Sequence, residues 1–259
     1  MLFNSYEFIF LFLPFTFLVY FYLLKIRLPL VAKGFLVFSS LFFYSWWNIV
    51  YLPLILSSIL FNFIIGSSLN KSIRSVRFDR KIILITGIIS NVMLLGYFKY
   101  YDFFVYNLNY AFDSSIPIQN IVLPLAISFF TFQQIAYLVD SYRGETKEYD
   151  FLNYSLFVSF FPQLIAGPIV HHAEMMPQFL SRWNMIKNYR HIAMGIFIFS
   201  IGLFKKVILA DTFAKWATAG FDHAETLNAI EAWTASLSYT FQLYFDFAQN
   251  PYPFSTLTF

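Results

Sequence analysis

The chain alternates between long apolar runs and short polar loops from one end to the other. A helix that crosses the hydrocarbon core of a bilayer needs about 20 largely apolar residues. By this measure the pattern predicts about eight membrane segments, at residues 8–24, 34–47, 52–69, 82–98, 121–139, 151–170, 192–210 and 233–248. No repeat of fixed period and no Pro/Gly/Ser-rich linker divides the sequence. We therefore expect an all-α polytopic membrane protein.

Two regions depart from a simple span. Residues 103–112 are apolar but too few to cross a bilayer, so they could lie at the membrane interface or re-enter. The run at 151–170 is interrupted by Pro162 and by the pair Gly167 and Pro168. These residues break the helical hydrogen-bond ladder, and freed backbone groups at membrane depth are tolerated only inside protein or beside water. We expect this run to line a cavity or to re-enter the membrane.

The basic residues of the loops predict the orientation of the chain. The loop after the first run carries three basic residues and no acidic one, and the loop at 70–81 carries five against one. The loop between them, at 48–51, has no charge. This distribution predicts an N-terminus outside the cell and both basic loops in the cytoplasm. The basic segment at 182–190 would also face the cytoplasm.

Composition narrows the class of protein further. Apolar residues, counted with Tyr, make up 59 % of the chain, and charged residues make up 12 %, against about 25 % in soluble domains. These values argue against a disordered chain, a soluble enzyme and a nucleic-acid-binding protein, which would need a basic stripe. The absence of Cys excludes disulfides, thiol catalysis and Cys-ligated metals. The four His residues lack surrounding carboxylates, so no metal site is predicted.

Polar residues within apolar runs are costly and mark candidate sites. Four of them recur at helical spacing in the run at 121–139, which favours hydrogen bonds between helices: Ser128, Thr131, Gln133 and Gln134. His171 and His172 follow the broken run and could be general bases. Adjacent helical residues point roughly 100° apart, however, so these two cannot easily serve one site.

Charged side chains occur in the last two runs. Lys205 and Lys206 could extend their ammonium groups to the membrane surface at a cytoplasmic helix end, which is the favoured interpretation, or they could steer a phosphate-bearing substrate as a pair of cations. Asp246 lies among aromatic residues and needs a partner, either a lysine in a structural ion pair or another group of a site. Taken alone, these patterns indicate a polytopic protein with a polar cavity, and they do not choose between an enzyme and a transporter.

Motifs spread along the chain resemble those of the membrane-bound O-acyltransferase family, in family order. The most specific are LPLAISFFTF at 123–132, DSYRG at 140–144, FPQLIAGP at 161–168, the two lysines at 205–206 with ADT at 210–212, and QLYFDF at 242–247. Four further segments are similar to one bacterial branch of the family, which contains the alginate O-acetyltransferase membrane subunit and its peptidoglycan-acetylating relatives. They are MLFNS at 1–5, FLFLP at 10–14, FYSWW at 43–47 and LGYFKY at 95–100.

The resemblance implies a ring of helices thinned at its centre, where a tunnel joins the two faces of the bacterial inner membrane. It implies transfer of an acetyl group from a cytoplasmic donor, acetyl-CoA or similar, to hydroxyls of an extracytoplasmic polysaccharide. An SGNH-type extracytoplasmic partner would complete the transfer, and no bound cofactor or metal is implied. Candidate tunnel or substrate residues are Gln163, Gly167, Pro168, Lys205, Lys206, Tyr244 and Asp246.

The chain departs from the family pattern after QLYFDF. The family continues with SGYSDM, further spans, an RRWH segment and then its essential His, whereas residues 248–259 read AQNPYPFSTLTF. We therefore expect residues 1–248 to be the N-terminal part of the transmembrane domain and 249–259 to be an aberrant tail from a truncation or frameshift. The family's catalytic His would lie beyond residue 259. A non-catalytic remnant and a polytopic transporter are the alternative interpretations.

Overall fold

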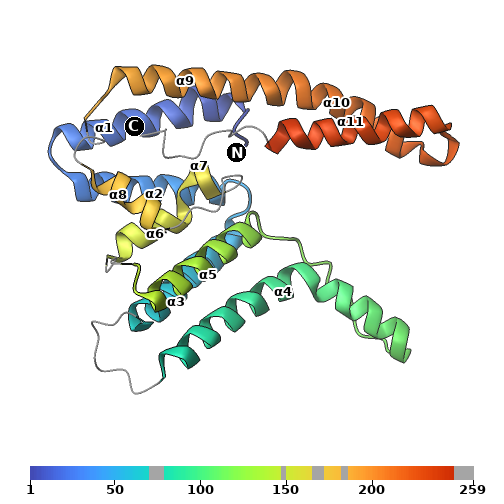
Figure 1. The fold of residues 1–259 in the computed structure, drawn as a ribbon, viewed down its shortest axis with the longest axis horizontal. Coiled ribbons are helices and arrows are strands. Elements are labelled where there is room, and N and C mark those ends of the chain that lie inside the picture. Colours follow the sequence, from blue (N-terminus) through green and yellow to red (C-terminus); the bar gives the residue numbers. More distant parts are fainter. Residues whose placement is uncertain (70–78, 147–149, 165–171, 182–185, 248–259) are drawn as a thin grey trace. The chain divides into compact units, whose positions relative to one another are not determined.

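The fold was obtained as a computed structural model, which describes residues 1–69, 79–146, 150–164, 172–181 and 186–247. Within these ranges the regular structure is helical and contains no strand (Figure 1). The α-helices are α1 (Leu13–Lys25), α2 (Pro29–Ser45), α3 (Leu52–Leu69), α4 (Arg80–Phe112), α5 (Ile127–Arg143), α6 (Phe151–Ser159), α7 (Phe161–Leu164), α8 (His172–Leu180), α9 (Tyr189–Phe204), α10 (Asp211–Asp222) and α11 (Ala229–Phe247).

Short helical segments of other types join some of these helices. π-helices occur at Glu7–Phe12 and Lys205–Ala210, and 3₁₀-helices at Ile49–Tyr51 and Ala224–Thr226. The chain divides into two compact units. The first unit contains Met1 and Tyr22–Leu180, and the second contains Leu2–Phe21 and Ser181–Phe259, so the boundary falls within α1.

Helices long and apolar enough to cross a membrane coincide with predicted runs. In the described part of the chain they are Glu7–Lys25, Ile49–Leu69, Arg80–Phe112 and Tyr189–Asp222, and α2 is a shorter apolar helix. The prediction of an all-α polytopic membrane protein is confirmed. The number of spans remains a prediction, because length and composition alone identify these helices.

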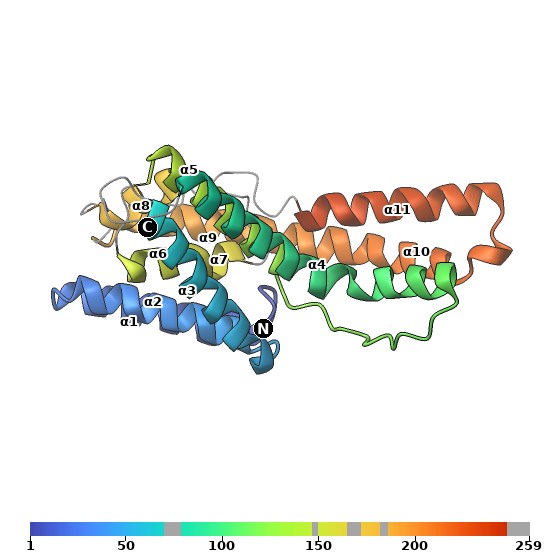
Figure 2. The same ribbon diagram turned by 90° about the horizontal axis from the view of Figure 1, so that it is seen from below.

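Residues 103–112 are not a separate segment, as the sequence suggested, but the C-terminal end of α4. The helix continues because no proline interrupts it, and Lys99 and Asp102 are tolerated within it. Its 33 residues would extend about 50 Å if straight, well beyond a hydrocarbon core of about 30 Å. Figures 1 and 2 show that α4 changes direction along its length. The C-terminal part of the helix therefore does not continue along the axis of the N-terminal part.

The connection from α4 to α5 folds back along the end of α4, as Figure 2 shows. The Asp102 carboxylate accepts hydrogen bonds from the backbone N–H groups of Gln119 and Ile121, both at 3.0 Å. Asn109 forms a second attachment, since its side chain bonds the backbone N–H of Ile116 at 3.0 Å and the carbonyl of Ile116 at 2.8 Å. These bonds hold an extended segment that has no regular structure of its own.

The predicted run at 121–139 forms a helix that begins and ends later than expected. Pro124 precedes a turn in which the Ile127 N–H donates to its carbonyl, and Ala126 has a left-handed φ of 58°. At the other end Gly144, with φ of 79°, stops the helix, a conformation that glycine adopts without steric cost. The helical part is therefore α5, Ile127–Arg143.

The interruption predicted for residues 151–170 is confirmed by the end of α6. This helix ends at Ser159, and the separate short helix α7 follows at Phe161–Leu164. With 9 residues α6 is about 14 Å long, so it cannot cross a bilayer alone. Gly167 and Pro168, which were predicted to extend the interruption, lie outside the described residues.

In the second unit, α9, the π-helix and α10 form one continuous helix, Tyr189–Asp222, and α11 returns alongside α10 (Figures 1 and 2). The phenyl ring of Phe213 on α10 packs on Phe241 and Phe245 of α11, at centroid distances of 5.2 and 6.0 Å. Gly220 permits a close approach, because a Cβ there would overlap the Cβ of Ala235. The two helices form a tightly packed hairpin.

Candidate functional site

A buried cluster of amide side chains joins α3, α4 and α5 in the first unit. Asn62 Nδ2 donates to Gln134 Oε1 at 2.7 Å and to Asn91 Oδ1 at 3.1 Å, and Asn91 Nδ2 donates back to Asn62 Oδ1 at 2.6 Å. Ser58 Oγ also donates to Gln134 Oε1, at 2.7 Å. All four side chains are buried. Because polar groups are costly in an apolar interior unless paired, this cluster fixes the three helices against one another.

Two of the four polar positions predicted on the fifth run, Gln133 and Gln134, have this helix-tying role. Gln134 belongs to the amide cluster, and Gln133 Nε2 donates to the Phe157 carbonyl on α6 at 2.9 Å. Their interpretation as helix-to-helix hydrogen bonds is confirmed. Thr131 is also buried, but its hydroxyl has no hydrogen-bond partner among the described residues.

Sequence reasoning missed the other members of the amide cluster. Asn62 and Asn91 are isolated amides within long apolar runs, and that isolation was the available signal. An amide at such a position must bond another side chain or a backbone carbonyl, and Asn62 and Asn91 do both, through one another and through the carbonyls of Ser58 and Gly87. The sequence could have identified their need for a partner, but not which partner.

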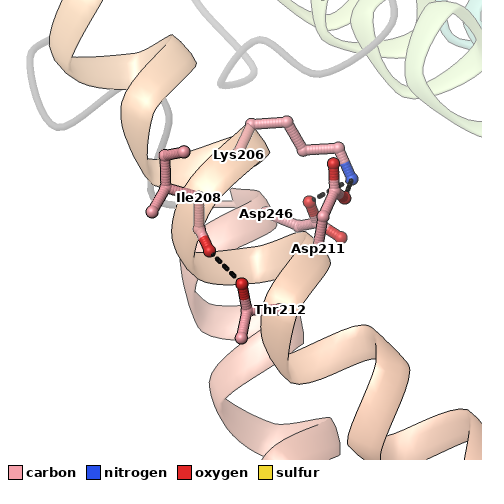
Figure 3. Close-up of polar contacts among 5 residues, drawn as sticks. All are labelled: Lys206, Ile208, Asp211, Thr212 and Asp246. Carbon is pink, nitrogen blue, oxygen red and sulfur yellow. Dashed lines mark hydrogen bonds and ion pairs between the residues drawn. The ribbon is translucent and has the colours of Figure 1, made fainter.

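The second unit contains a charged cluster at the π-helix, shown in Figure 3. The Lys206 ammonium lies 3.1 Å from Asp211 Oδ1 and 2.7 Å from Asp246 Oδ1. The side chains are partly buried, with exposed fractions of 29 %, 44 % and 26 % for Lys206, Asp211 and Asp246. One lysine therefore neutralises part of the charge of two carboxylates that come from different helices.

This cluster bears on the interpretation of Lys206. Steering of a phosphate-bearing substrate was one of two interpretations of Lys205 and Lys206. The Lys206 ammonium is held by two carboxylates, and these three charged groups together carry a net charge of −1. The role of the lysine pair toward a phosphate-bearing substrate stays a prediction. The lysine partner expected for Asp246 is Lys206, and the role of either residue in a tunnel stays a prediction.

The position of Lys206 along its helix exposes a conflict between two predictions. Lys206 lies 17 residues after Tyr189 in a continuous helix, a rise of about 26 Å, close to the thickness of a hydrocarbon core. If this helix crosses the membrane, the basic segment at 182–190 and Lys206 cannot both lie at the cytoplasmic face. The sequence suggested a cytoplasmic position for both, because neither the charges of the loop nor the lysine pair shows how long the helix between them is.

The remaining candidates are distributed over both units. Gln163 is buried on α7 in the first unit. Tyr244 is on α11 in the second unit and is 63 % exposed, with its ring edge-on to Phe245 at 5.2 Å. Gly167, Pro168 and His171 lie outside the described residues. Within the described part of the chain, no group of three or more His, Cys, Asp and Glu could hold a metal ion.

Comparison with known proteins assigns the chain to a family. It is 50 % identical over 274 residues to a protein named peptidoglycan O-acetyltransferase from Helicobacter pylori, a match that covers 96 % of this chain and 52 % of the relative. The profile of MBOAT, the membrane-bound O-acyltransferase family, matches residues 141–254. The chain belongs to the membrane-bound O-acyltransferase family. Both the family named from the motifs and the bacterial branch are confirmed.

Other members of this membrane-bound O-acyltransferase family are more distant. A protein named probable alginate O-acetylase AlgI from Pseudomonas aeruginosa is 37 % identical over 257 residues, covering 96 % of this chain and 47 % of the relative. The AlgI protein of Azotobacter vinelandii is 36 % identical over 254 residues, covering 96 % of this chain and 49 % of the relative. The chain thus spans about half the length of the relatives it matches.

Proposed function

We propose that this chain is the N-terminal part of a membrane O-acetyltransferase. The enzyme would move an acetyl group from a cytoplasmic donor such as acetyl-CoA to hydroxyls of an extracytoplasmic polysaccharide. The observation that carries the proposal is 50 % identity over nearly the whole chain to a protein named peptidoglycan O-acetyltransferase. Because the relatives named alginate O-acetylase are 33–37 % identical, peptidoglycan is favoured over alginate as the acceptor.

In this proposal the chain supplies the scaffold and the rest of the enzyme supplies the base. A histidine base beyond residue 259 would take a proton from the attacking hydroxyl, and donors in a water-poor tunnel would stabilise the oxyanion that forms. The amide cluster of Asn62, Asn91 and Gln134 would keep three helices in place around the tunnel. The broken run after α6, with Gln163, is the proposed tunnel wall.

The setting of the enzyme follows from the same proposal. The chain would lie in the bacterial inner membrane with its N-terminus outside, since the basic loops near residues 25–33 and 70–81 favour the cytoplasm. An SGNH-type partner outside the membrane would pass the acetyl group to the glycan, and membrane lipid would surround the apolar helices. Residues 1–248 form the N-terminal part of the transmembrane domain in this view.

A chimera tests the proposal directly. The chain replaces the region that it matches in the Helicobacter relative, and the chimera is produced, together with that relative's proposed SGNH-type partner, in a bacterium that does not acetylate its own peptidoglycan. Ester-linked acetate is then released from purified peptidoglycan by mild base and measured. We expect acetate well above the vector control from the chimera, and none from the 259-residue chain alone.

The controls separate the competing interpretations. The intact Helicobacter relative serves as the positive control, and membrane levels of all three proteins are matched by immunoblot. A chimera that is present at matched levels and yields no acetate would favour the non-catalytic remnant or the transporter. Acetate from the 259-residue chain alone would contradict the assignment of the catalytic base to the remaining half.

A further inference from the structure

The π-helix Lys205–Ala210 places two charged residues together that an α-helix would keep apart. A π-helix turns roughly 80° per residue and an α-helix roughly 100°. Residues five positions apart therefore lie about 40° apart around a π-helix and about 140° apart around an α-helix. Lys206 and Asp211 are five positions apart, and their side chains form an ion pair at 3.1 Å. The pair depends on the π geometry.

The same two residues are also joined through the backbone. The N–H of Asp211 donates to the carbonyl of Lys206, the hydrogen bond across five residues that defines a π-helix. The Thr212 hydroxyl donates to the Ile208 carbonyl at 2.5 Å within the same turn (Figure 3). A side-chain bond and a backbone bond between one pair of residues thus stabilise one wide turn, which is intrinsically rarer than an α-helical turn.

Lys206 also connects this turn to the neighbouring helix. Its bond to Asp246, at 2.7 Å, is the shorter of its two ion pairs and attaches α11 to the π-helix. Since α10 and α11 pack tightly through Phe213, Phe241 and Phe245, the hairpin is expected to move as one body. The conformation of the π turn therefore sets the direction of both α10 and α11 relative to α9.

We propose that Lys206 is a conformational latch that holds the π turn and, through it, the orientation of the α10–α11 hairpin. When the pair with Asp211 is lost, the six residues of the turn relax to an α-helix. Six residues turn about 480° as a π-helix and about 600° as an α-helix, so α10 rotates by roughly 120° about its axis relative to α9. The hairpin then has two discrete orientations, and the latch selects one. This proposal is independent of the acetyltransferase proposal.

Distance measurements between spin labels test the latch. Because the chain has no Cys, single cysteines at Ile196 and Trp216 give one defined label pair on exposed positions of α9 and α10. The labelled 259-residue chain is reconstituted in nanodiscs, and the distance distribution is measured by pulsed electron resonance. We expect one distribution for the parent and a shifted or second distribution for Asp211→Asn, while Asp222→Asn, an exposed change on the same helix, matches the parent.

Deletion of Val207 separates a latch from a general loss of structure. Removing one residue from a π turn leaves an α-helix whose two ends keep their relative orientation. The deletion variant should therefore keep the parent distance, and adding Asp211→Asn to it should change nothing. The latch is refuted if Asp211→Asn leaves the distribution unchanged in the full-length turn, or if the same substitution shifts it equally after the deletion.

Discussion

At the scale of single residues, this membrane protein is organised by a few polar side chains, most of whose partners come from other helices. Asn62 and Asn91 exchange hydrogen bonds between α3 and α4, and Lys206 joins Asp211 and Asp246. Each buried amide is stable in an apolar interior only while its partner is present, because an unpaired buried polar group loses its hydration without compensation. The consequences of losing one partner are therefore larger than those of losing both.

The reciprocal amide pair gives the first prediction. Asn62→Leu should lower the free energy of unfolding by about 1–3 kcal/mol, because buried Asn91 loses the side chain with which it exchanges two hydrogen bonds. The double variant with Asn91→Leu should be less destabilised than the sum of the two single variants. The free energies of unfolding of the parent, the two single variants and the double variant are obtained from denaturation in detergent, followed by circular dichroism. Strict additivity would mean that the two amides do not depend on one another.

At the scale of elements, helix packing decides which glycines are required. A Cβ at Gly66 on α3 would lie 2.8 Å from the Tyr137 hydroxyl oxygen on α5, whereas a Cβ at Gly96 on α4 has nothing within 4 Å. Gly66→Ala should therefore destabilise the chain by about 1–3 kcal/mol. The matched control Gly96→Ala should be neutral or stabilising by up to about 1 kcal/mol, since alanine favours a helix. Equal effects of the two changes in thermal melts would refute the close contact.

The extended segment after α4 gives a second prediction at this scale. Asp102 is its main attachment, because a charged acceptor bonds two backbone N–H groups. Asp102→Ala should raise hydrogen exchange at Gln119 and Ile121 about tenfold or more, as expected for a loss of at least 1.4 kcal/mol. Ser115→Ala, an exposed change in the same segment, is the control. Unchanged exchange at both amides would show that the segment is held elsewhere.

The elements also show how far the sequence could predict the fold. Hydropathy located the apolar helices, because burial in lipid needs only length and composition. It divided α4 too early, since Lys99 and Asp102 resembled the end of a span, and it began α5 six residues too soon. It could not find the π turn, because hydrogen bonds between residues five positions apart produce no recognisable hydropathy period over so short a segment.

At the scale of the whole molecule, the family could be read from motifs while the geometry of the candidate site could not. The motif residues Gln133 and Gln134 prove to tie helices, and the paired lysines include one that two carboxylates already hold. Which polar residues meet depends on helix packing, which a local pattern does not contain. The chain spans about half the length of the relatives it matches, and in our proposal it supplies the scaffold while the chemistry belongs to the complete enzyme.

The most direct test of acetyl transfer across the membrane uses sealed vesicles. Inside-out vesicles that contain the chimera and its glycan acceptor are supplied with acetyl-CoA carrying a labelled acetyl group, and right-side-out vesicles receive the same donor. We expect label in the glycan, released by mild base, only from the inside-out vesicles, whose cytoplasmic face meets the donor. Equal labelling in both orientations would contradict a cytoplasmic donor site, and no labelling by an intact chimera in either orientation would contradict acetyl transfer itself.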